Sequence, residues 1–278
     1  MIVHHPFKLH LWGPFELTGF GVAMLLAFLI GQIVCVAELT RRGREEGTNA
    51  MGDVTVAAVV GGLLGAKIYY AILTHDPLDL LSRAGFVFWG GLTGGILATF
   101  AVIRWRKIPF TRISDVAGIG IAAAYAVGRT GCWAVGDDYG RPWASRFAVS
   151  FPQGAPPSTV ENMIQQFGVR SLQGRPPNEL VSVYPTQLFE VAMALVMFAV
   201  LWRLRDHKHA EGWLFGLYCV LAGTERFVVE FFRAKDDRFF GPLTLAQVIA
   251  LGFIAGGAVW MRMRMQVRSG APGIYATA

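Results

Sequence analysis

Seven apolar stretches, each long enough to cross a lipid bilayer as a helix, dominate the sequence. A bilayer core needs about 20 apolar residues per helix, and these stretches lie near residues 15–37, 54–74, 85–103, 115–135, 185–203, 211–230 and 241–262. Only 16% of the 278 residues are charged, whereas soluble proteins average roughly 25%. The sequence therefore predicts an all-α integral membrane protein with about seven transmembrane helices, organised as one polytopic domain over residues 1–278.

Basic residues in the loops predict the orientation of these helices. Short cytoplasmic loops collect Lys and Arg, so we interpret the net charge of +6 as a topology signal and expect no nucleic-acid partner. The loops after the first, third and fifth stretches and the C-terminal tail hold thirteen basic residues, namely Arg41, Arg42, Arg44, Arg104, Arg106, Lys107, Arg112, Arg203, Arg205, Lys208, Arg262, Arg264 and Arg268. The C-terminus is then cytoplasmic and the N-terminus outside. Residues 136–184, between the fourth and fifth helices, form a small extracytoplasmic head.

Three basic residues fall inside or at the edge of predicted spans: Lys67, Arg129 and Arg226. A charge at bilayer depth costs several kcal/mol unless it is paired or faces water, so each is a candidate functional residue. The alternative is a side chain that extends to the membrane surface or joins two helices. The N-terminal residues lack the pattern of a cleavable signal, and we expect the first helix to remain in the protein.

The segment RFVVEFFR places Arg226, Glu230 and Arg233 at positions i, i+4 and i+7. This spacing puts all three on one face of a helix. Arginine presents a planar fork that matches phosphate oxygens, and a carboxylate can hold that fork in place. The stripe predicts a buried anion site, with an interhelical salt bridge as the alternative.

The segment GRTGCWAVGDDYGR, residues 128–141, contains Arg129. Gly136 and Gly140 should end the helix and leave Asp137, Asp138 and Arg141 in an irregular segment near the outer surface. In YPTQLFE, Gln187 and Glu190 project from adjacent turns of one helical face, and Gly90 and Gly91 belong to a small-residue packing surface in WGGLTGG.

These segments together resemble bacterial prolipoprotein diacylglyceryl transferases, as a divergent member or paralogue. The resemblance covers most of the chain and also includes GAKIYY at 65–70 and LTLAQVIAL at 243–251. It implies a multi-pass protein of the bacterial inner membrane that moves the diacylglyceryl group of phosphatidylglycerol to the lipobox cysteine of a preprolipoprotein signal peptide and releases glycerol phosphate. No cofactor or metal is implied.

The resemblance also implies roles for particular residues. Arg129 and Arg226 match the family's essential arginines, while Asp137, Gly140 and Glu230 match further family positions. With Arg129, the expected substrate-binding residues are Gly140, Arg141, Lys67, Arg233, Gln187, Glu190, Gly90 and Gly91.

Four positions depart from the family pattern. Trp89 stands where the family usually has His, Cys132 replaces Asn, and Phe20 and Ala222 replace tyrosines; Glu225, next to Arg226, is a further unusual residue. The proton acceptor is then Asp137, Glu230 or the phosphate leaving group. Two alternatives stay open: a paralogue with another acceptor or lipid, and a non-catalytic protein that binds anionic lipid or lipoprotein.

Overall fold

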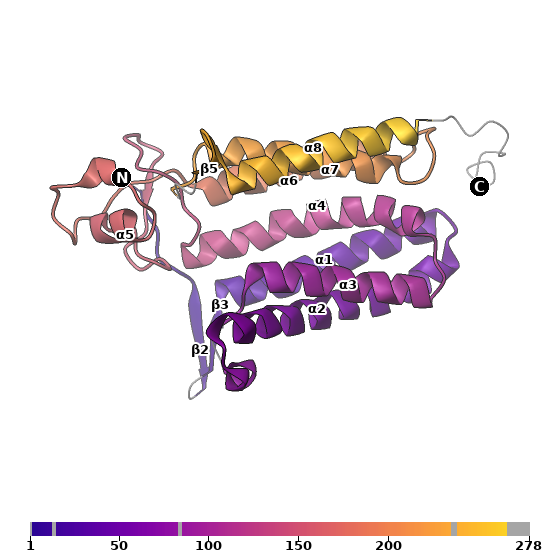
Figure 1. Ribbon diagram of the computed structural model, residues 1–278, viewed down its shortest axis with the longest axis horizontal. Helices are drawn as coiled ribbons and strands as arrows, with labels where there is room; N and C mark the ends of the chain where they lie inside the picture. The colour runs from indigo at the N-terminus through magenta and orange to yellow at the C-terminus, as the bar shows by residue number, and fades with distance from the viewer. Residues whose placement is uncertain (1, 13–14, 83–84, 235–237, 266–278) are drawn as a thin grey trace. The chain divides into compact units, whose positions relative to one another are not determined.

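The computed structural model describes residues 2–12, 15–82, 85–234 and 238–265. Each of the seven apolar stretches is occupied by a long helix (Figure 1). The helices are α1 (Gly19–Arg41), α2 (Glu45–Thr74), α3 (Phe88–Trp105), α4 (Phe110–Val135), α6 (Thr186–Arg203), α7 (Trp213–Glu230) and α8 (Leu245–Met263). Within the described residues the chain forms two compact units, one of residues 2–31 with 118–265 and the other of Gln32–Ala117, so α1 and α4 contribute to both.

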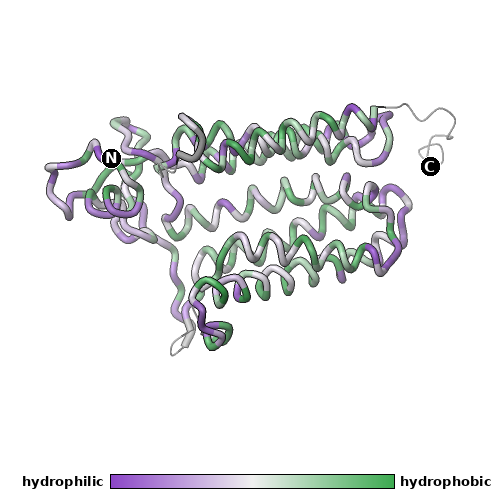
Figure 2. The backbone as a smooth tube through the Cα atoms, viewed as in Figure 1, coloured by the Kyte–Doolittle hydropathy of each residue, from purple (hydrophilic) through white to green (hydrophobic). Residues whose placement is uncertain are grey.

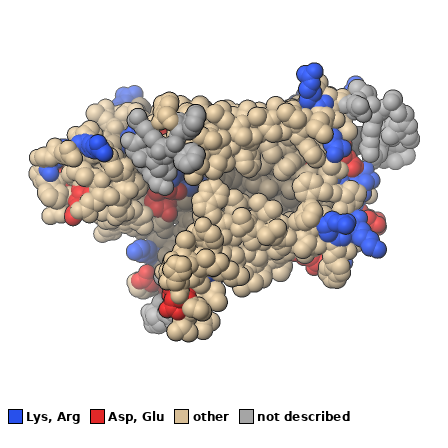
Figure 3. Space-filling model, in the orientation of Figure 1, with Lys and Arg blue, Asp and Glu red and all other residues tan. Residues whose placement is uncertain are grey.

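Five of the long helices, α1, α2, α4, α6 and α8, are long and apolar enough to cross a membrane. Their residues are mainly hydrophobic, whereas the connecting loops are mainly hydrophilic (Figure 2). On the face drawn in Figure 3, charged side chains gather near the helix ends. The prediction of an all-α multi-pass membrane protein is therefore confirmed, while the crossing of α3 and α7 stays a prediction.

Four predicted helix starts differ from the structure by four residues or more, those of α1, α2, α4 and α8, and the first two have identifiable causes. The first helix begins at Gly19 instead of residue 15, because Phe15–Thr18 forms strand β3, which pairs with β2 (Lys8–Trp12) as an antiparallel hairpin. The second helix begins at Glu45, nine residues before the predicted position 54, since a polar first turn precedes its apolar part. Hydropathy alone locates the apolar part of a helix and not its polar ends.

In the unit that contains Gln32–Ala117, α2 and α3 pack through glycines. Gly61 and Gly65 on α2 face Gly90 and Gly94 on α3, and a Cβ atom on Gly65 would lie 2.9 Å from the Cα of Gly94. Small residues four apart let membrane helices approach closely. The predicted packing role of WGGLTGG is therefore confirmed, and GGLLG at 61–65 is its partner surface.

We expect Gly65→Val to destabilise this unit by about 1–3 kcal/mol, because the added methyl groups would meet backbone atoms of α3. Gly52→Val on the same helix is the matched control, since a Cβ at Gly52 meets nothing within 4 Å. Thermal unfolding in detergent tests the difference. Equal midpoints for the two variants would contradict the packing account.

In the other unit, α7 and α8 pack closely in the same manner. A Cβ on Gly257 would lie 2.7 Å from the carbonyl oxygen of Gly216, and one on Gly223 would lie 2.7 Å from that of Ala250. The Thr244 side chain and Gln247 form a capping box that starts α8. This packing fixes α7, which carries Arg226 and Glu230.

Residues 136–184 build a small core of their own. Tyr139, Phe151, Val160 and Met163 are buried in it, and the short elements are β1 (Ile2–Val3), β4 (Val149–Ser150), α5 (Val160–Gln165) and η2 (Arg170–Leu172). Strand β4 pairs in parallel with β1. The remaining short elements are η1 (Pro77–Leu81) and the paired strands β5 (Arg238–Phe240) and β6 (Leu243–Thr244).

Candidate functional site

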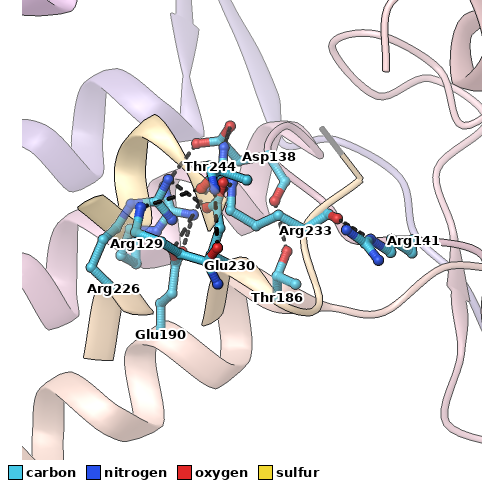
Figure 4. A network of polar contacts seen from close by, with 10 residues as sticks. Arg129, Asp138, Arg141, Thr186, Glu190, Arg226, Glu230, Arg233 and Thr244 are labelled. Carbon is cyan, nitrogen blue, oxygen red and sulfur yellow. Dashed lines mark hydrogen bonds and ion pairs between the residues drawn. The ribbon is translucent and has the colours of Figure 1, made fainter. Parts of the chain in front are cut away.

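Three arginines and three carboxylates meet in one unit where α4 and α7 end and α6 begins (Figure 4). We call this group the charge cluster; its members are Arg129, Asp138, Glu190, Arg226, Glu230 and Arg233. The glutamate side chains are 2% exposed. Charges buried to this degree are costly unless they are paired, and here every member has a partner of opposite sign.

Arg129 lies at the centre of the cluster. Its Nη1 donates to Asp138 Oδ2 at 3.0 Å and to the sulfur of Cys132 at 3.0 Å, and its Nη2 forms an ion pair with Glu190. The guanidinium is therefore held between a carboxylate from the loop after α4 and one from α6. Such an arrangement fixes the plane of the fork.

Arg226 and Arg233 flank Glu230. Arg226 Nη2 lies 2.7 Å from Glu230 Oε2, and Arg233 Nε lies 3.8 Å from the same oxygen. Arg233 Nη2 also donates to Asp138 Oδ1 at 2.7 Å. Asp138 thus joins Arg129 to Arg233. The cluster is more than a single interhelical salt bridge. Each of its three carboxylates lies within 4 Å of two arginines.

The loop that carries Asp138 is held by neighbours far away in sequence. Gly136 ends α4 with φ +70°, and Asp138 itself has φ +54°. Tyr139 is buried in the head core, where its hydroxyl donates to the Pro156 carbonyl at 3.0 Å. A Cβ on Gly140 would lie 2.7 Å from Tyr184 Cβ, so only glycine allows this close approach.

Two residues at the start of α6 also hold this loop. The Thr186 hydroxyl donates to the carbonyl oxygen of Asp138 at 2.7 Å, and the Gln187 amide donates to that of Asp137. Gln187 and Glu190 lie on one buried face, as predicted. Gln187 therefore positions the loop, and Glu190 holds Arg129.

The carboxylate of Asp137 lies beside the thiol of Cys132. The two side chains form a hydrogen bond, and burial together with the neighbouring Asp138 raises the pKa of Asp137 to about 6. Burial alone would raise the pKa of Asp138 as well, but Arg233 and Arg129 hold it below its usual value. Two adjacent aspartates therefore have different electrostatic roles: Asp138 is an anion that binds arginine, and Asp137 can accept a proton.

Cys132, Asp137 and Asp138 also form the one group of possible metal ligands found within the described residues, with ligand atoms within 4.8 Å of one another. The sulfur of Cys132 and Oδ2 of Asp138 both accept from Arg129 Nη1. A guanidinium therefore already supplies positive charge to two of the three groups.

Two N–H groups of the arginines are buried without a partner among the described residues: Arg129 Nε and Arg226 Nη1. A buried donor without a partner is costly and rare in native proteins. Two of them on guanidinium groups of one cluster indicate a site for an acceptor-rich anion. Phosphate oxygens fit such donors well.

The structure brings together most of the predicted site residues. Arg129, Arg226, Glu230, Arg233 and Glu190 are members of the cluster. One detail was wrong: α7 ends at Glu230, so Arg233 is not part of the predicted helical stripe. It reaches Glu230 and Asp138 from the turn that follows α7, where it forms a β-bridge with Gly140. Asp138, which joins two arginines of the cluster, is not among the site residues that the sequence predicts.

Other predicted residues have structural partners elsewhere. Arg141 donates to the carbonyl oxygen of Arg233 at 2.9 Å, so it braces the loop. Lys67, Gly90 and Gly91 belong to the other unit. Lys67 donates to the Ser82 hydroxyl at 3.0 Å and to the Ser82 carbonyl, and a substrate-binding role for it stays a prediction.

The divergent positions are also placed. Cys132 contacts Arg129 directly, and Ala222 lies on α7 one turn before Arg226. Phe20 lies at the start of α1, where a Cβ on Gly131 would be 3.2 Å from its Cα. Trp89 belongs to α3 in the other unit. Of the four changes, only that at Cys132 is seen to contact the charge cluster among the described residues.

Comparisons with known proteins identify the family of this chain. A family model described as prolipoprotein diacylglyceryl transferase matches residues 6–263. Relatives named phosphatidylglycerol–prolipoprotein diacylglyceryl transferase include one from Clostridioides difficile (strain 630), 28% identical over 88% of this chain and 89% of that relative. Others are from Xanthomonas oryzae pv. oryzae (strain PXO99A), 29% identical over 90% of this chain and 88% of the relative, and Idiomarina loihiensis, 26% identical over 95% of both. The chain belongs to the prolipoprotein diacylglyceryl transferase family.

Proposed function

We propose that this protein transfers the diacylglyceryl group of phosphatidylglycerol to the thiol of a lipobox cysteine in a preprolipoprotein. The observation that carries the proposal is the pair of buried, unpartnered N–H groups on Arg129 and Arg226 within the described residues, inside a cluster that fixes both side chains. The names of the relatives supply the substrates. The geometry supplies a place for the lipid phosphate.

The chemistry needs a cation and a base. The thiol sulfur bonds to C3 of the lipid glycerol, the bond between C3 and the phosphate oxygen breaks, and glycerol phosphate leaves with the electron pair. Donors fixed in advance stabilise the charge that develops on the leaving phosphate, which is the role we assign to Arg129 and Arg226. Asp138, Glu190, Glu230 and Arg233 position them, and Gly140 and Gln187 hold the loop.

We assign the thiol proton to Asp137. The thiolate is the nucleophile, so a base must remove the proton. Of the two acidic residues expected as bases, Glu230 is paired with Arg226 and lies near Arg233. Asp137 keeps a buried oxygen, Oδ1, without a partner among the described residues.

The Asp137 assignment predicts a pH dependence. The pKa of Asp137 is about 6, and the base must be unprotonated, so the transfer rate should rise with pH below about 6 and level off above it. In Asp137→Asn the transfer rate should no longer rise with pH in this range, and it should be about 10²–10⁴-fold lower than that of the wild type at pH 8. Initial rates between pH 5 and 8 test this. If the transfer rate of the variant rises with pH as in the wild type, Asp137 is not the base.

We further propose that all seven long helices cross the bacterial inner membrane as one polytopic domain, with the N-terminus and residues 136–184 outside and the C-terminus in the cytoplasm. The loop charges support this orientation. It puts the charge cluster, at the ends of α4 and α7 and the start of α6, near the outer leaflet, where exported preprolipoproteins arrive.

A complementation experiment tests the proposal in cells. The chain is expressed in bacteria depleted of their own transferase, and conversion of a lipobox reporter is followed. Rescue by the wild-type protein and loss of rescue in Arg226→Ala are expected. No rescue despite membrane insertion and phosphatidylglycerol binding would instead favour a non-catalytic lipid-binding paralogue, for which the replacements at Trp89 and Cys132 are the motivating observations.

A further inference from the structure

Glu225 is a buried carboxylate that the proposed reaction does not use. It lies on α7 directly before Arg226 and is 5% exposed. Its Oε1 is buried and has no hydrogen-bond partner in the described part of the chain. A buried charge without a partner destabilises the fold. The packing around Glu225 therefore does not explain why a carboxylate is present at this position.

The surroundings of Glu225 do not screen it. With Leu221 and Thr224 it lines a cavity of about 270 Å³ between α6 and α7, whose α6 wall includes Met193 and Met197. The Thr224 hydroxyl donates to the Val220 carbonyl at 2.8 Å, so it is already engaged. In such apolar surroundings the charge of Glu225 acts over a longer range than it would in water.

Glu225 acts on the charge cluster. Buried directly before Arg226 on α7, its carboxyl group lies within electrostatic range of Glu190 and of the three arginines of the cluster. The phenol groups of Tyr125 and Tyr218, on α4 and α7, also lie within its electrostatic range. The carboxylate therefore modifies the potential at the arginines that we assign to the lipid phosphate, although no ion pair joins it to them in the part of the chain that the structure describes.

The net charge of the cluster determines how it can bind an anion. The arginines Arg129, Arg226 and Arg233 contribute three positive charges, and Asp138, Glu190 and Glu230 contribute three negative charges. These six charges cancel, Asp137 beside them is ionised at pH 8, and Glu225 adds a further negative charge. An anion must bind through the unpartnered N–H donors instead of through net positive charge, and a second negative charge on the ligand meets an opposing carboxylate.

We propose that Glu225 makes the site select a singly charged phosphodiester over a doubly charged phosphomonoester. This inference rests on the proposed function and deepens it. The donor, phosphatidylglycerol, is a phosphodiester with one negative charge. The product, glycerol phosphate, is a monoester that carries about two at pH 8, because its second pKa is about 6. Glu225 therefore favours release of the product after transfer.

Direct binding measurements test the selectivity. The full-length protein in detergent is titrated at pH 8 with dioctanoyl phosphatidylglycerol and with dioctanoyl phosphatidic acid, a phosphomonoester, and the ratio of the two dissociation constants is compared between variants. Wild-type protein should prefer phosphatidylglycerol. Glu225→Gln, which keeps the side-chain shape, should tighten phosphatidic acid relative to phosphatidylglycerol by about tenfold, or about 1.4 kcal/mol.

Two control variants sharpen the result. Glu225→Asp keeps the charge and should keep the wild-type ratio. Glu161→Gln removes an exposed carboxylate on α5 and should also leave the ratio unchanged. A ratio that changes less than twofold in folded Glu225→Gln protein overturns the inference, as does a wild-type protein that binds neither lipid. A shifted ratio in a protein without transferase activity would support the inference while contradicting the proposed function.

Discussion

Arg226→Ala is expected to slow diacylglyceryl transfer by about 10³-fold while the protein stays folded. Arginines that stabilise a leaving phosphate contribute about 10³–10⁵ in rate in phosphoryl-transfer enzymes. Arg226 is the most exposed arginine of the cluster, with 34% of its side chain accessible, against 11% for Arg129 and 17% for Arg233. Its carboxylate partner, Glu230, also keeps Arg233 nearby at 3.8 Å. The fold therefore depends little on Arg226, and the reaction depends on it strongly.

Two further variants separate charge from shape. Arg226→Lys keeps the charge but loses the planar fork, so we expect a rate between wild type and Arg226→Ala. Arg146→Ala removes an exposed arginine that lies over the Phe147 ring in the head, and its rate should equal that of the wild type. Initial rates of transfer to a lipobox peptide, measured for each variant, test these expectations. If Arg226→Ala retains more than a tenth of the wild-type rate, the phosphate role is wrong.

Glu190→Gln is expected to destabilise the protein by about 3–5 kcal/mol, the usual cost of breaking a buried ion pair. Its side chain is 2% exposed and pairs with Arg129, and Arg233 Nη1 lies 3.8 Å away. The substitution removes the charge and keeps the volume, which leaves Arg129 buried with less compensation. A lower midpoint of thermal unfolding in detergent, together with loss of transfer, is the predicted result.

A double variant identifies the cause. Arg129→Leu with Glu190→Leu replaces the ion pair by apolar side chains, and such replacements are often neutral or stabilising. This variant should be more stable than Glu190→Gln and should still lack transferase activity, because the phosphate donor is gone. A double variant as unstable as the single one would show that Glu190 stabilises the fold through contacts other than the arginine pair.

The sequence allowed the helices and most of the site to be predicted, because both depend on local patterns. Apolar runs of about 20 residues identify membrane helices, and Arg226 and Glu230 are four residues apart on one of them. The predicted start of α1 was wrong because Phe15–Thr18 forms a strand that pairs with Lys8–Trp12 instead of a first helical turn. Local hydropathy does not report such pairing.

The role of Asp138 could not be assigned from sequence for a similar reason. Asp137 and Asp138 are adjacent and chemically identical, and only the backbone after α4, with φ +54° at Asp138, directs one toward the arginines and the other toward Cys132. That backbone is held by Gly140 against the distant Tyr184. Two neighbouring acidic residues next to a glycine that ends a helix are the signal that could have led to it.

The central claim is that this protein moves diacylglyceryl from phosphatidylglycerol to a cysteine thiol, and intact-mass analysis of an acceptor peptide tests it most directly. Purified protein is reconstituted in vesicles that contain phosphatidylglycerol and is mixed with a lipobox peptide, with the Clostridioides difficile relative as positive control. The account predicts a peptide that gains one diacylglyceryl group on its cysteine, with one glycerol phosphate released per peptide. An unmodified peptide under conditions where the relative modifies it would contradict the account.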